Sequence, residues 1–81
     1  MAHRPRAIIR VTRFRTLFRF SGIGDQFTFD TLIRDLRAAL PNAVFDWREH
    51  SWTLPTQELP ALLAFLRSRS IGTLASPVVA Y

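Results

Sequence analysis

The chain has 81 residues, 48% of them hydrophobic, and a formal net charge of +5. This length suits a single small domain, and the apolar content is sufficient for a compact core. The absence of cysteine excludes disulfides, thiol catalysis and cysteine-ligated zinc.

The same composition limits the other classes of site. The only imidazoles, His3 and His50, are too few for a convincing metal site, so we expect no metal and no cofactor. We expect no membrane partner, since no apolar run is long enough to span a bilayer. Recurring arginines interrupt the apolar segment that a secretory signal needs, which favours a cytoplasmic protein.

The basic charge is concentrated at the start of the chain. Every basic residue is an arginine, and the first acidic residue is Asp25. The arginines that precede it are Arg4, Arg6, Arg10, Arg13, Arg15 and Arg19. A field of this kind suits phosphates or an acidic protein surface.

Residues 1–6 are expected to form a flexible basic lead-in, and residues 7–20 have the composition of a strand. Phe14, Phe18 and Phe20 share one parity and should face the core, whereas Arg13, Arg15 and Arg19 share the other. Before Phe14, most apolar residues fall on odd-numbered positions instead of even-numbered ones. A bulge or a break into two strands near Thr12 would explain that change.

Residues 21–26 are expected to form a loop, and a helix should run from an N-cap at Asp30 or Thr31 to about Leu40. Residues 43–47 and 51–54 are expected to form a hairpin around 48–50. Thr56 is a plausible N-cap of a second helix, for which Gly72 would provide the C-cap. The apolar stripe of this helix is Leu59, Leu62, Leu63, Phe65 and Leu66.

The predicted order is therefore β–α–β–β–α, with residues 73–81 as a final edge strand or a tail. This order predicts an α+β fold in which two helices cover one face of a small antiparallel sheet, for example a ferredoxin-like split βαβ. Residues 7–72 would form one domain.

The hairpin together with the two predicted helices resembles the HARP-type domain that accompanies annealing and branch-migrating helicases. The matching positions, within residues 27–70, are Phe29, Leu32, Ile33, Leu36, Leu40, Asp46, Trp52, Leu54, Pro55, Leu59, Leu62 and Leu63. The chain departs from the family pattern at Phe45, where a tryptophan is usual, and at Arg37-Ala38. The resemblance implies binding to structured DNA, particularly at junctions between single and double strands. No phosphate-binding loop motif of a helicase motor occurs, so we expect no ATP hydrolysis by this chain.

We therefore expect a nucleic-acid-binding module, DNA being favoured over RNA, that acts as an accessory subunit of a larger machine. The residues expected to contact nucleic acid are Arg10, Arg13, Arg15, Arg19, Trp47, Arg48 and His50. Trp47 would either stack on a base or cover the hairpin, while Trp52 should belong to the core. The alternative is an adaptor or self-assembling subunit whose basic strand docks on an acidic partner. An enzyme is not expected, since no credible nucleophile, base and metal set is present.

Overall fold

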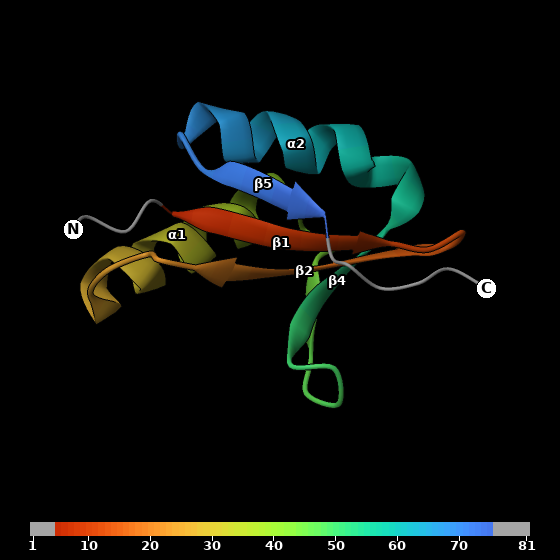
Figure 1. The fold of residues 1–81 in the computed structure, drawn as a ribbon, viewed down its shortest axis with the longest axis horizontal. Helices are drawn as coiled ribbons and strands as arrows, with labels where there is room; N and C mark the ends of the chain where they lie inside the picture. Colours follow the sequence, from red (N-terminus) through yellow and green to blue (C-terminus); the bar gives the residue numbers. More distant parts are fainter. Residues whose placement is uncertain (1–4, 76–81) are drawn as a thin grey trace.

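A five-stranded sheet and two α-helices make up residues 5–75, the part of the chain that the computed structural model describes (Figure 1). The elements in chain order are β1 (Arg6–Val11), β2 (Arg15–Ser21), α1 (Gln26–Ala39), β3 (Val44–Asp46), β4 (Ser51–Pro55), a 3-10 turn η1 (Thr56–Glu58), α2 (Leu59–Ser68) and β5 (Gly72–Ala75). The predicted α+β fold is confirmed.

The N-terminal segment breaks into two strands joined by a tight turn. The backbone N–H of Thr12 donates to the carbonyl of Arg15 at 2.8 Å, and the Thr12 hydroxyl accepts from the Arg15 N–H at 3.0 Å. Arg13 and Phe14 form the tip of this turn. The prediction that Phe14 faces the core is wrong: its side chain is 76% exposed, because the turn places it beyond the sheet.

The sheet has the strand order β3-β4-β2-β1-β5. It is mixed and not purely antiparallel as predicted, since β5 pairs in parallel with β1. β4 is antiparallel to both β2 and β3, so β2, α1 and β3 form a split βαβ unit around β4. The sheet departs from the ferredoxin-like layout in one respect, because β1 is inserted between β2 and β5.

Helix α1 begins earlier than the sequence predicted. Asp25 has an extended backbone, and its side chain accepts a 2.7 Å hydrogen bond from the Thr28 N–H, as an N-cap does. The first turn contributes little to the core, which explains why the apolar stripe begins only at Leu32.

Both helices pack on one face of the sheet. The strands present alternate residues to this face, and α1 and α2 contribute their leucines to the same cluster. The buried members are Ala7, Ile9, Phe18, Leu32, Leu36, Leu40, Ala43, Trp52, Leu54, Leu62, Phe65, Leu66 and Ile71. The core location predicted for Trp52 is confirmed.

The ends of α2 differ from the prediction. The Thr56 hydroxyl does not cap a helix but donates to the carbonyl of Thr12 at 2.8 Å. At the C-terminal end Ser70, at φ 57°, has the left-handed conformation that was expected of Gly72, which instead begins β5. The N–H of Ile71 donates to the Leu66 carbonyl at 2.9 Å and completes a Schellman motif.

Candidate nucleic-acid interface

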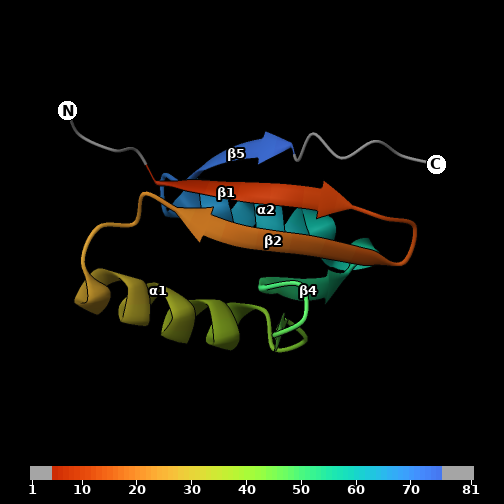
Figure 2. The same cartoon turned by 60° about the horizontal axis from the view of Figure 1, so that its bottom comes forward.

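Within residues 5–75, no helix lies over the opposite face of the sheet, and arginines dominate this face of β1 and β2. Figure 2 shows this side, with β1 and β2 in front of α2. Strand alternation places Ile8 and Leu17 on it, among four arginines. We call this surface the arginine face: Arg6, Ile8 and Arg10 from β1, and Arg15, Leu17 and Arg19 from β2.

The strand register interleaves charged and aliphatic side chains on the arginine face. Ile8 lies opposite Arg19, and Arg10 lies opposite Leu17. Arg10 and Arg19 are therefore diagonal neighbours, with roughly 7–8 Å between their backbones. Leu17 is only 4% exposed although it lies on this uncovered side, since the arginine stems and the β3–β4 turn surround it.

Two of the four arginines are paired with acids of the β3–β4 hairpin. Arg10 Nη2 lies 3.3 Å from Glu49 Oε2, and Arg15 Nη1 lies 3.8 Å from Asp46 Oδ2. Within residues 5–75, no carboxylate lies within 4.0 Å of the guanidinium of Arg6 or Arg19. The arginine face therefore keeps an excess of positive charge.

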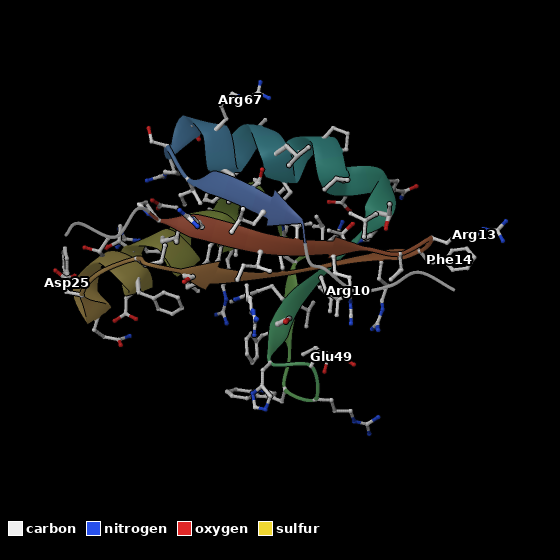
Figure 3. The ribbon with its side chains drawn as sticks, in the orientation of Figure 1. Arg10, Arg13, Phe14, Asp25, Glu49 and Arg67 are labelled. Carbon is white, nitrogen blue, oxygen red and sulfur yellow. The ribbon has the colours of Figure 1, made fainter. Side chains whose placement is uncertain are left out.

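The hairpin acids meet the arginine face because the turn projects on the side of the sheet away from α2 (Figure 1). The Asp46 carboxylate accepts from the Arg48 N–H at 2.9 Å and from the Glu49 N–H at 3.4 Å. His50 has φ 50°, in the left-handed region, and reverses the chain into β4. These contacts fix the shape of the turn, from which Glu49 reaches Arg10 (Figure 3).

A hollow of about 190 Å³ lies between the central strands and this turn. Its lining residues are Ile8, Arg10, Leu17, Arg19, Glu49 and Ser51. Charged and polar side chains therefore make up most of its lining, beside two aliphatic ones.

The structure brings together only part of the predicted contact set. Arg10, Arg15 and Arg19 share the arginine face, but Arg13 does not share a strand face with them, because it lies in the β1–β2 turn. Its guanidinium carbon is 5.4 Å from the centre of the Phe14 ring, at the far end of the hairpin from α1 (Figure 3).

The remaining predicted contact residues, Trp47, Arg48 and His50, lie in the β3–β4 turn and not on β1 or β2. Trp47 is 78% exposed and meets the Phe45 ring edge-on, with 4.7 Å between ring centroids. Phe45 in turn packs against Trp52, so Trp47 contacts the core side of the hairpin. Arg48 and His50 are exposed in the turn.

Sequence reasoning missed Arg6 as a member of this surface and assigned it to the lead-in. The signal was present in the alternation of Arg6, Ile8 and Arg10, which continues the strand one residue earlier. The pairing of the hairpin acids with the arginines is a long-range contact that no local pattern indicates.

Within residues 5–75, no three histidine, aspartate or glutamate side chains gather where they could hold a metal ion. Neither helix of this part of the chain has the length and apolarity needed to cross a bilayer. Fold and surface together describe a small α+β domain with one covered sheet face and one open, basic face. No protein-family model, curated protein or solved structure matches the chain.

Proposed function

We propose that this domain binds nucleic acid through the arginine face, and that its arginines contact backbone phosphates. The observation that supports the proposal is the gathering of four arginines on a sheet face without a helix cover, two of them without an acidic partner among the described residues. Guanidinium groups form paired hydrogen bonds with phosphate oxygens, which suits them to this role.

The side chains between the arginines define the kind of contact. They are aliphatic, so the arginine face offers no aromatic platform on which bases could stack. Binding through phosphates gives affinity that depends strongly on salt and little on sequence. The resemblance to HARP-type domains favours structured DNA over RNA as the ligand and an accessory role beside a larger machine.

Two exposed sheet edges favour a second candidate, a protein adaptor or self-assembling subunit. β3 and β5 are the outer strands, and each exposes an aliphatic side chain, Val44 and Leu74. An unpaired strand edge can accept a strand from another chain. In this case the arginine face would meet an acidic protein.

The test compares two double variants in binding to a labelled DNA with a single-strand/double-strand junction, measured by fluorescence anisotropy. Arg15→Ala/Arg19→Ala removes two charges from the arginine face. Arg34→Ala/Arg67→Ala, the matched control, removes two exposed charges from the helices. Each lost phosphate contact lowers the slope of log affinity against log salt by about 0.9, so the first variant should bind on the order of a hundredfold more weakly at 50 mM salt.

Equal binding by the two variants would contradict the proposal. The same DNA sequence made as RNA should bind more weakly than the DNA. Purification at low salt separates the two candidate functions: a raised ratio of absorbance at 260 nm to that at 280 nm indicates carried-over nucleic acid. One stoichiometric protein partner, without nucleic acid, would favour the adaptor.

A further inference from the structure

The hollow on the arginine face has the charge and size to hold a small anion. Two arginines, Arg10 and Arg19, line it from neighbouring strands. A water molecule takes up roughly 30 Å³ of liquid. The volume of about 190 Å³ is therefore large enough for a tetrahedral oxyanion together with some solvent.

One anion already lies at this hollow, and it belongs to the protein. Glu49 Oε2 is 3.3 Å from Arg10 Nη2, in the position that a phosphate oxygen would take on the same guanidinium. The pair is partly exposed, with 36% of the Arg10 side chain and 45% of the Glu49 side chain accessible. Ion pairs with such exposure contribute little to stability, so a competing anion can displace the carboxylate.

The rest of the turn does not need to move when Glu49 leaves Arg10. The turn is held by Asp46, which accepts two backbone N–H groups, and by the Ser51 hydroxyl, which donates to the Glu49 carbonyl at 3.1 Å. A rotation of the Glu49 side chain alone would uncover the guanidinium of Arg10.

We infer that the hollow is a phosphate subsite and that Glu49 occupies it in the unbound protein as an internal competitor. This inference rests on the proposed function, because the phosphate that displaces Glu49 is then a backbone phosphate of nucleic acid. Arg19 holds the incoming phosphate first, and Arg10 joins it when Glu49 swings away. The turn thereby attenuates binding and selects ligands with enough charge density to displace a carboxylate.

Glu49→Gln tests this competition directly, because it removes the charge and keeps the size of the side chain. The variant should bind the junction DNA about threefold to tenfold more tightly, as the loss of one like charge close to a phosphate in a solvent-exposed site implies. Glu58→Gln is the matched control: Glu58 lies in η1, accepts a hydrogen bond from Asn42 at 2.8 Å and forms no ion pair within the described residues. It should leave the affinity within twofold of the parent.

A double-mutant cycle separates competition on Arg10 from a general effect of charge. In an Arg10→Ala background, Glu49→Gln should change the affinity by no more than Glu58→Gln does, since the group for which Glu49 competes is gone. A gain of equal size with and without Arg10 would overturn the inference. So would a Glu49→Gln variant that binds no more tightly than the control.

Pyrophosphate and inorganic phosphate serve as probes that do not depend on nucleic-acid binding. Followed by NMR, their titration should shift the guanidinium Nε–Hε resonances of Arg10 and Arg19, and at lower concentration in Glu49→Gln. If neither resonance moves, the subsite is refuted, even where DNA binds elsewhere on the arginine face. If both move while no nucleic acid binds, the subsite stands for free phosphate and the proposed function fails.

Discussion

Two adjacent leucines of α2 provide a sensitive test of how the core is built. The sequence places Leu62 and Leu63 in the same apolar stripe, and truncation of Leu63 would then cost as much as that of any core leucine. In the structure, Leu62 is completely buried between α2 and the sheet, whereas Leu63 is only partly buried. The two substitutions remove the same atoms from the same helix, so any difference between them comes from packing.

The expected costs follow from the carbons that each substitution removes from a buried site. Leu62→Ala removes three buried carbons, or about 2.4 kcal/mol of transfer free energy, and the cavity left behind raises the total to about 3–5 kcal/mol. Leu63→Ala removes the same carbons from a partly buried position, where the cost should be about 1.5–2 kcal/mol because the vacated space is open to water. A domain of this size has a stability of about 4–12 kcal/mol, so Leu62→Ala should remove at least about a quarter of it.

Urea denaturation followed by far-ultraviolet circular dichroism measures both costs. The midpoint should fall slightly for Leu63→Ala and severely for Leu62→Ala, with similar slopes for the parent and Leu63→Ala. Leu36→Ala, at another fully buried position, should resemble Leu62→Ala. Equal costs at positions 62 and 63 would show that the face of α2 toward the sheet is assigned wrongly.

The C-terminal end of α2 and the N-terminal end of α1 give further predictions. Ser70→Gly should raise the free energy of unfolding by about 0.4–1 kcal/mol, since glycine adopts the left-handed conformation at φ 57° without strain. Ser68→Gly, at the last residue of α2, should lower it, and urea denaturation measures both changes. The pKa of Asp25 lies below its usual 3.8 because the Thr28 N–H donates to the carboxylate. The stability that this carboxylate contributes is therefore complete above about pH 4 and is lost as pH falls through the lowered pKa. Asp25→Asn should flatten the parent's stability profile between pH 5 and 2, and an unchanged profile would contradict the capping role.

Local patterns were enough to predict most of the fold. The leucine spacing indicated both helices, and the parity change near Thr12 indicated the break between β1 and β2. The alternation of apolar and charged residues could not show which residues form the turn. Placing the reversal at Arg13 and Phe14 moves both residues off the sheet and brings Arg10 onto the same face as Arg15 and Arg19.

Two of the features that sequence reasoning missed depend on contacts between distant segments. The parallel pairing of β5 with β1 joins the two ends of the described chain, and no periodic pattern in the sequence indicates it. The contact of Glu49 with Arg10 likewise depends on the direction in which the β3–β4 hairpin leaves the sheet. At Asp25 the signal was local but was obscured, because Phe27 follows the cap with an exposed side chain where an apolar stripe would be expected to begin.

The position of β1 between β2 and β5 has a consequence for how the protein is made. β1 can pair with β2 early, through a turn of two residues, but its other edge finds its partner only at Gly72–Ala75. Contacts that join distant parts of a chain form slowly, because the loop between them must close first. During synthesis, one edge of β1 would therefore stay unpaired, beside the row of arginines, until residues 72–75 are made. We expect this interval, more than the stability of the finished domain, to determine whether the chain folds or aggregates.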